Sequence, residues 1–182
     1  MKQTSLLSKE TILRAHVFDI QKVAVRLPDG RERSYDLVDH ANAVTILPVD
    51  DDGQVYFVSQ YRIGAEKELL ELPAGVMEKG EDPLPSARRE LREEIGMDCQ
   101  ELRFLGGFYM AAGYSNEYMH CYLAQGLFKA PLMQDEDEFL SLSIKSLDET
   151  YAMVWMGQIE DSKTLGALLF AYPILKEKLS SI

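Results

Sequence analysis

The chain has 182 residues, of which 46% are hydrophobic and 27% are charged, and its formal net charge is −11. This composition fits one globular domain that buries its own core, with room for a small appendage. The negative charge argues against nonspecific binding of nucleic acid, and the chain has no apolar run of about 18 residues such as a membrane span requires.

The two cysteines, Cys99 and Cys121, do not form a Cys-x-x-Cys pair, so neither a metal–thiolate site nor a disulfide framework is expected. Residues 1–5 lack the apolar core of a secretory signal. We therefore expect a protein of the reducing cytoplasm. The acidic charge is compatible with a small phosphorylated ligand, because divalent ions and one or two arginines reverse the field inside a pocket.

The first third of the chain predicts a β-hairpin followed by a buried strand. Residues 22–27 alternate polar and apolar side chains, Pro28-Asp29-Gly30 forms a turn, and residues 33–38 return as the partner strand. Residues 43–49 form a continuous apolar run, which is typical of a strand buried on both faces. Further strands are predicted over residues 55–61, 102–110, 118–124 and 139–144. Helices are predicted over residues 147–156 and from Thr164 onward, and Pro173 is expected to kink or end the last helix.

A glycine-containing loop leads into the most clearly specified helix of the chain. Gly75 and Gly80 allow a loop that other residues would not follow, and a first helical turn tolerates Pro83 and Pro85. Gly96 suits the left-handed conformation that ends a helix. The apolar side chains expected to pack on a sheet follow helical spacing: Leu84, Ala87, Leu91 and Ile95.

Three acidic residues of this helix gather on one side of it. Glu90, Glu93 and Glu94 fall within roughly 100° of one another at 3.6 residues per turn. Like charges at this spacing repel each other and destabilise a helix. The cluster makes physical sense where a cation lies over it, and carboxylate oxygens suit the hard ions Mg²⁺ and Mn²⁺. The alternative, a solvated acidic helix, explains neither the glycines nor the spacing.

This segment resembles the signature of the Nudix hydrolases. The fixed positions of that signature are occupied in register by Gly75, Glu81, Arg89, Glu90, Leu91, Glu93, Glu94 and Gly96, and Met97 stands where Ile, Leu or Val is more usual. The ADP-ribose pyrophosphatase branch is resembled by residues 60–62, 70–75, 113–117 and 135–139 and by Thr164-Leu165. That branch commonly has a proline where this chain has Ala112, a departure that bears on the substrate and not on the hydrolase chemistry.

The resemblance implies a fold of class α/β, with an α/β/α sandwich around a mixed β-sheet over residues 41–182. It also implies that residues 1–40 form a small β-sheet arm, which contributes to a homodimer.

The resemblance further implies a set of metal ligands. Glu90 and Glu94, four residues apart on one helix face, are assigned as the principal ligands. Glu93 shares a second ion and counts among the catalytic residues, and the backbone carbonyl of Ala74 completes the coordination. Glu81 is expected to bind metal through water or to orient Arg89. The role expected for Arg89 is structural: it pairs with the signature carboxylates and holds the loop.

The remaining site residues are expected outside the helix. The catalytic base is expected on a distant acidic loop, at Glu136 or Glu138, with a solvated loop as the alternative for both. Arg62 is expected to bind a phosphate bidentately, and the alternative is a surface arginine at a strand end. Glu71 is expected to accept a hydrogen bond from adenine or ribose. Tyr114 is expected to stack on the ligand or line its pocket, and a structural role is the alternative for both residues.

The predicted function is a metal-dependent pyrophosphohydrolase, with Mg²⁺ or Mn²⁺, that cleaves ADP-ribose or a related nucleoside diphosphate sugar to a nucleoside monophosphate and a sugar phosphate. Alternatives within the fold are another substrate (NADH, a dinucleoside polyphosphate or a GDP-sugar), a mutase or isomerase, and a sensor that binds nucleotide sugars without cutting them. A sensor would have lost metal ligands, whereas this chain keeps its acids. The expected partners are this small molecule and a second copy of the chain, with neither nucleic acid nor membrane.

Overall fold

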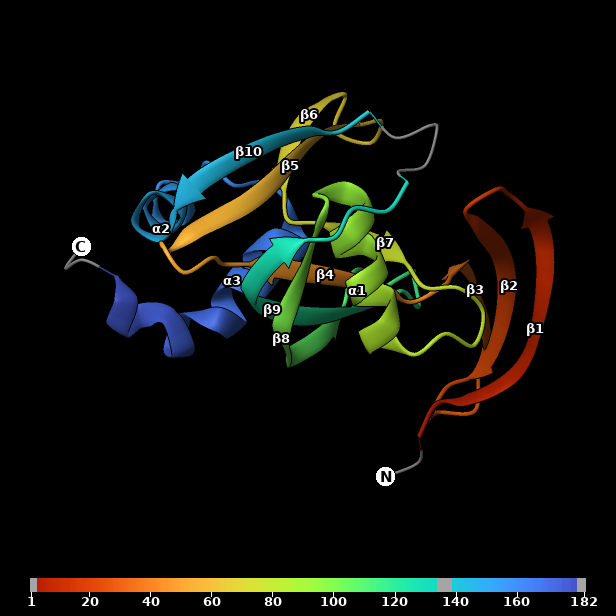
Figure 1. Ribbon diagram of the computed structural model, residues 1–182. Helices are drawn as coiled ribbons and strands as arrows, with labels where there is room; N and C mark the ends of the chain where they lie inside the picture. The colour runs from red at the N-terminus through yellow and green to blue at the C-terminus, as the bar shows by residue number, and fades with distance from the viewer. Residues whose placement is uncertain (1–2, 134–138, 180–182) are drawn as a thin grey trace. The chain divides into compact units, whose positions relative to one another are not determined.

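The computed structural model describes residues 3–133 and 139–179, and the chain forms two compact units (Figure 1). The first unit comprises Met1–Asn42 and Tyr109–Tyr118, and the second comprises Ala43–Phe108 and Met119–Ile182. No helix within the described residues combines the length and the apolar character needed to cross a membrane.

The first unit is built on a three-stranded antiparallel sheet in the order β1-β2-β3, with β1 at Ser5–Arg14, β2 at Phe18–Arg26 and β3 at Glu32–His40. The predicted hairpin is confirmed as β2 and β3, and Gly30 in its turn has a φ of +90°. The strand β1 lies within the expected β-sheet arm but is not among the individually predicted strands. Its pairing with β2 contains two register shifts, and the sequence of this strand shows no regular alternation of polar and apolar residues.

The second unit contains a mixed sheet in the order β7-β4-β9-β8. Its centre is β4 (Ala43–Pro48), every residue of which is buried, as the apolar run predicts. The neighbours of β4 are β9 (Tyr118–Lys129), which runs parallel to it, and β7 (Ala74–Val76), which runs antiparallel. The outer strand is β8 (Met97–Tyr109).

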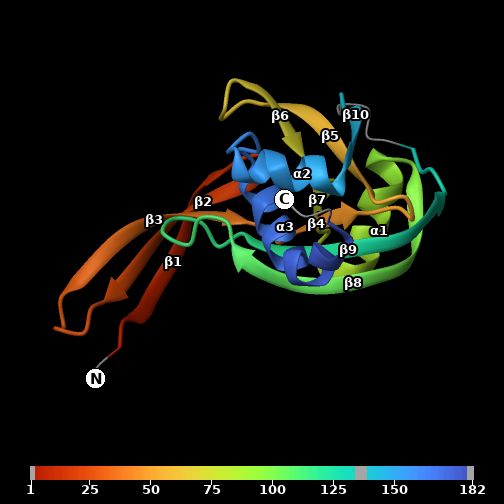
Figure 2. The same ribbon diagram turned by 90° about the vertical axis from the view of Figure 1, so that its left-hand side faces the viewer.

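Helices cover both faces of this mixed sheet. In Figure 1, α1 (Pro83–Glu94) lies in front of β4 and α3 (Ser162–Leu175) lies behind it, and Figure 2 shows the same order from the side. Side chains of a strand alternate between its two faces, so β4 contributes to the contacts with both helices. This layering is the expected α/β/α sandwich.

A second sheet has the order β10-β5-β6, with β10 at Ser141–Ser146, β5 at Gln54–Arg62 and β6 at Lys67–Glu71. The helix α2 (Leu147–Trp155) follows β10 directly. After α3, the described part of the chain continues through one 3₁₀ turn at Lys176–Lys178. Pro173 lies inside α3, and the helix continues past it to Leu175. The helix therefore ends just after the proline and not at it.

The packing of α1 confirms one part of its predicted apolar stripe and corrects another. Ala87 and Leu91 are fully buried in a cluster with Val44 and Ile46 of β4, and Ile95 packs against the edge of this cluster. Leu84 is 46% exposed and does not belong to the core. Helical spacing predicts which residues share a face, but it does not predict how far the sheet extends along that face.

Candidate active site

The helix α1 carries the acidic residues of the site, and local sequence fixes its two ends. It begins at Pro83. The first N–H groups of a helix have no acceptor within the helix, so a proline, which lacks an N–H, removes no helical hydrogen bond there. It ends at Glu94, and Gly96 follows with a φ of +70°, as expected for a glycine after a helix. The acids at 90, 93 and 94 therefore lie in the C-terminal part of a helix whose neighbouring face, at Ala87 and Leu91, is anchored in the core.

Glu90 lies against the backbone of the preceding loop at Gly75. The Glu90 side chain is buried, and a Cβ added to Gly75 would overlap its carboxylate group. No residue with a side chain fits at position 75 while Glu90 keeps this position. The φ of Gly75 lies outside the left-handed region, so glycine is required here for the close approach of Glu90 and not for the backbone conformation.

Glu94 contacts the same short strand, β7. The Glu94 carboxylate accepts a hydrogen bond at its Oε2 atom from the backbone N–H of Ala74, at 3.1 Å. Two of the three predicted metal-binding acids thus touch consecutive residues, Ala74 and Gly75. Because β7 also pairs with β4, the loop, the helix and the central strand are fixed together at this point.

Arg89 holds the acids and the loop together, which confirms the pairing predicted from the sequence. Its guanidinium donates to Glu90 at 2.6 Å, to Glu93 at 3.1 Å and to Glu81 at 3.2 Å. Burial alone would lower the pKa of Arg89, but the hydrogen bond to Glu81 and the charges of the three glutamates hold it above its ordinary value. Arg89 therefore stays protonated and offsets part of the repulsion among the acids.

Glu81 is the member of this group that comes from the loop. Its carboxylate accepts hydrogen bonds from the backbone N–H of Glu78, at 2.9 Å, and from Arg89. Partial burial raises the pKa of Glu81, but these hydrogen bonds outweigh it and the net pKa lies below the ordinary value. Glu81 is thus a stable anion that keeps the loop closed on Arg89, in agreement with one of its two predicted roles.

The donor chemistry of these residues fits a hard divalent cation. Glu90, Glu93 and Glu94 offer carboxylate oxygens, and Ala74, whose carbonyl is the predicted fourth ligand, lies on the strand that contacts Glu94. Within the described part of the chain, no three His, Cys, Asp or Glu side chains are already gathered as a metal site. Each carboxylate has about four lone-pair positions, so the contacts with Arg89 and Ala74 are compatible with metal coordination.

Arg62 and Glu71 form one ion pair, which the sequence analysis did not anticipate. The Arg62 guanidinium donates two hydrogen bonds to the Glu71 carboxylate, at 2.7 and 2.6 Å. Glu71 is fully buried and also accepts from the ammonium group of the buried Lys163. Arg62 is 41% exposed, so it reaches solvent from a position that Glu71 fixes. The predicted contacts of Arg62 and Glu71 with substrate stay predictions.

Tyr114 belongs to the first unit, in a loop that is hydrogen-bonded to β3. The Val38 N–H donates to the carbonyl of Tyr114, at 2.7 Å. The Asn116 side chain accepts from the His40 N–H, at 2.9 Å, and donates to Asp39. Tyr114 is 63% exposed, which leaves its ring accessible to a ligand.

The predicted base residues, Glu136 and Glu138, lie outside the described residues.

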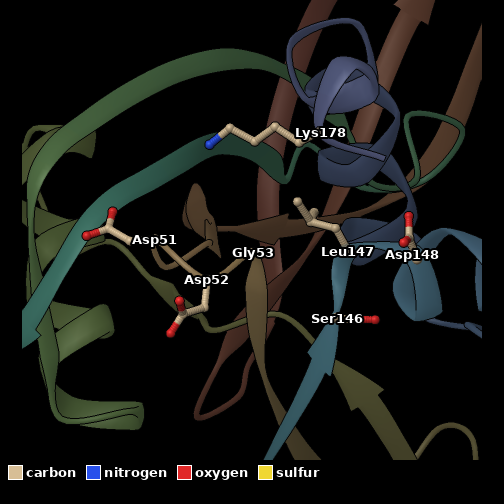
Figure 3. Close-up of a pocket in the computed structure, with 7 residues that line it drawn as sticks. All are labelled: Asp51, Asp52, Gly53, Ser146, Leu147, Asp148 and Lys178. Carbon is tan, nitrogen blue, oxygen red and sulfur yellow. The ribbon is translucent and has the colours of Figure 1, made fainter. Parts of the chain in front are cut away.

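The second unit also contains a pocket of about 370 Å³ that none of the predicted site residues lines. Figure 3 shows Asp51 and Asp52 of the turn after β4 on one side of it and Asp148, at the start of α2, on the other. The Leu147 N–H donates to the carbonyl of Gly53, at 2.9 Å, and so ties the turn to α2.

A domain model described as NUDIX matches residues 39–165 of this chain. The chain belongs to the Nudix family. The methanol dehydrogenase activator of Bacillus methanolicus is 37% identical over 163 residues, which cover 88% of this chain and 88% of that protein. The ADP-ribose pyrophosphatase of Bacillus subtilis (strain 168) is 35% identical over 177 residues, covering 96% and 95% of the two chains.

A crystal structure of an ADP compounds hydrolase superposes with a TM-score of 0.85 at 27% identity, and the match covers 98% of this chain and 97% of that one. The predicted family and fold class are confirmed by these matches. The chain is accordingly an enzyme of the Nudix hydrolases, which act on phosphorus-containing anhydrides and generally depend on divalent metal ions.

The residues that sequence reasoning missed lie at the start of α3. Lys163 contacts Glu71 and Thr164 contacts Leu72, each 92 positions earlier in the chain, and Asp161 accepts a hydrogen bond from the Thr164 hydroxyl. Only the resemblance at Thr164-Leu165 pointed to this segment, and it gave no role for either residue.

Proposed function

We propose that this enzyme is a Mg²⁺- or Mn²⁺-dependent pyrophosphohydrolase that cleaves the diphosphate of ADP-ribose or a related nucleoside diphosphate sugar. The products are a nucleoside monophosphate and a sugar phosphate. The observation that carries the proposal is the packing of Glu90 and Glu94 against Gly75 and Ala74, which keeps two acids beside one short strand. The names of the relatives, an ADP-ribose pyrophosphatase and an ADP compounds hydrolase, support the substrate class.

The chemistry requires that negative charge be neutralised before water attacks the diphosphate. Bound divalent ions polarise phosphoryl oxygens and lower the pKa of coordinated water. In this chain Glu90, Glu93, Glu94 and the Ala74 carbonyl would hold them. Arg89 keeps the acids of α1 together, and its positive charge is fixed by three glutamates. Glu136 or Glu138 is proposed to accept the proton of the attacking water.

Arg62 and Tyr114 are proposed as substrate-binding residues. Two N–H groups of the Arg62 guanidinium point to Glu71, which orients its plane, and the side chain is partly exposed. A guanidinium has five N–H donors, so this pairing is compatible with a further contact to a phosphate oxygen. Glu71 is proposed to orient Arg62 for this contact, and its own hydrogen bond with adenine or ribose stays a prediction. Tyr114 offers an exposed ring for stacking on a base.

The test is a substrate panel with both products identified. Purified protein with Mg²⁺ is incubated with ADP-ribose, GDP-sugars, NADH and dinucleoside polyphosphates, and the products are separated and weighed by mass spectrometry. We expect AMP and ribose 5-phosphate from ADP-ribose at the highest kcat/KM of the panel. Absence of nucleoside monophosphate from every member would refute the proposal.

The Glu94→Gln variant separates catalysis from binding. It replaces a charged oxygen by a neutral amide while keeping the shape of the side chain. We expect kcat to fall about 10²-fold or more, as is usual when a charge that serves the transition state is removed, while the nucleotide Kd changes little. Steady-state kinetics and calorimetric titration with the product AMP measure the two quantities. Parental turnover would remove Glu94 from the metal site.

The N-terminal arm is proposed to join two copies of the chain in a homodimer. All ten residues of β1 are exposed, among them Leu6, Ile12 and Leu13, each more than half accessible. An uncovered strand with apolar side chains is a common site of association. The test is analytical ultracentrifugation of the protein and of a variant in which Leu6, Ile12 and Leu13 are changed to Ser. We expect a dimer for the protein and a monomer for the variant.

The proposed location of the protein is the cytoplasm.

A further inference from the structure

Residues 71–75 connect β6 to the active site, and side chains from other elements hold this segment at successive positions. Glu71 is paired with Arg62 and Lys163. The carbonyl of Pro73 accepts hydrogen bonds from the Ile46 N–H, at 2.9 Å, and from the Thr45 hydroxyl, at 3.3 Å. The segment then reaches Ala74 and Gly75, which contact Glu94 and Glu90.

Leu72, in the middle of this segment, is held by Thr164 of α3. The Leu72 N–H donates to the Thr164 hydroxyl oxygen, at 2.8 Å, and the hydroxyl donates in turn to Asp161, at 2.6 Å. The same Asp161 oxygen accepts from the Thr164 N–H, at 2.9 Å, and so caps the start of α3. Thr164 and Leu72 are both fully buried, so neither group has water as a replacement partner.

This hydrogen-bond relay lies close to the metal-binding residues along the chain. Consecutive Cα atoms are about 3.8 Å apart, so a displacement of Leu72 is passed within two residues to Ala74. Ala74 donates to Glu94, and the backbone at Gly75 lies directly against the Glu90 carboxylate. A shift of Leu72 would therefore move the acids and the Ala74 carbonyl relative to each other.

We infer that Thr164, capped by Asp161, is a positioning residue that sets the metal affinity of the active site by fixing the backbone at Leu72. This inference rests on the proposed function, in which Glu90, Glu94 and Ala74 hold divalent ions. Groups that orient metal ligands commonly change metal affinity by about 10- to 100-fold when they are removed, and Thr164 acts in this way through the backbone.

Three fully buried threonines of the second unit form a matched set for the test. Thr164 binds Leu72, and Thr45 binds Pro73 through a longer hydrogen bond. Thr150 of α2 has a hydroxyl oxygen with no hydrogen-bond partner among the described residues. Replacement by valine keeps the shape of each side chain and removes only its hydroxyl. Thr164→Ser removes a methyl group and keeps the hydroxyl.

The experiment measures Mn²⁺ binding to each folded variant by electron paramagnetic resonance, without substrate, alongside the thermal midpoint and steady-state kinetics. We expect the Mn²⁺ Kd of T164V to rise about tenfold and that of T45V to rise less. The Kd of T164S should stay within about threefold of the parent, and that of T150V should not change. In turnover assays, T164V should need correspondingly more metal for half-maximal rate.

A lower thermal midpoint of T164V together with a parental Mn²⁺ Kd would assign Thr164 a purely stabilising role and overturn the inference. An equal rise in T150V would overturn it as well. If T164V does not fold, T45V decides, because a parental Kd there contradicts positioning through the 71–75 segment. The inference fails separately from the proposed function: the order of Mn²⁺ affinities is measured without turnover, whereas the substrate panel uses the parent protein alone.

Discussion

Gly75 is the single residue on which the arrangement of the acids most directly depends. A methyl group at this position would occupy the space of the Glu90 carboxylate, to which the three nearest atoms all belong. The end of a glutamate side chain moves easily, so the fold can accept Gly75→Ala by displacing Glu90. We therefore expect kcat to fall at least about tenfold, while the thermal midpoint changes by no more than a few degrees.

The control for this substitution is Gly64→Ala, in the turn between β5 and β6. A Cβ at Gly64 meets no atom within 4 Å, and its φ is not in the left-handed region. Kinetics and thermal unfolding of both variants separate a local displacement from a general effect of adding a methyl group. Full activity of the Gly75→Ala variant would show that Glu90 does not need its present position.

At the same scale, the pairing of Arg89 with acids of α1 could be predicted because these residues lie on one helix, where side-chain directions follow from the helical repeat. The ion pairs of Glu71 could not be predicted in this way, because no local pattern marks its partners. Its partner Lys163 lies 92 positions away in the chain. The contact exists only because β6 and α3 meet in the folded chain, which no local pattern encodes.

Among the elements, α1 joins the site to the core. Its two leucines, one near each end of the helix, differ in burial. Leu91 is fully buried against β4, whereas Leu84 is 46% exposed. Leu91→Ala should lower the free energy of unfolding by about 2–5 kcal/mol, because it leaves a cavity in the core. Leu84→Ala should cost less than about 1 kcal/mol. Urea denaturation measures both values, and equal losses would contradict the packing described for this helix.

The strands show where sequence patterns succeed and where they do not. The buried strand β4 was predicted almost to its ends because both of its faces are apolar. The strands β1 and β7 were not predicted individually. Every residue of β1 is exposed, so no burial pattern marks it, and β7 has three residues, too few to show a period.

Across the second unit, the ion pairs of Glu71 link β5, β6 and α3 and make stability depend on pH. Burial raises the pKa of Glu71, but Arg62 and Lys163 outweigh it and the net pKa lies below the ordinary 4.5. Asp161, beside Lys163, belongs to the same network. Because the folded pKa is below the unfolded one, the stabilisation is fully present above about pH 4.5 and is lost as pH falls through the folded pKa.

The Glu71→Gln variant tests this dependence. At pH 7 it should lower the free energy of unfolding by about 2 kcal/mol, less than for a fully buried pair because Arg62 is partly exposed. The difference between parent and variant should shrink as the pH falls below about 4.5 and through the lowered pKa of Glu71 in the folded parent. Denaturation curves between pH 3 and pH 8 measure it. A difference that grows as the pH falls would contradict the assignment of Glu71 as a buried anion.

The measurement that tests the whole account most directly is anomalous diffraction from crystals soaked with Mn²⁺ and a non-hydrolysable ADP-ribose analogue. We predict manganese peaks at about 2.0–2.2 Å from carboxylate oxygens of Glu90 and Glu94, next to the analogue's diphosphate. Crystals that hold the analogue with Glu90 and Glu94 away from any metal peak would contradict the account.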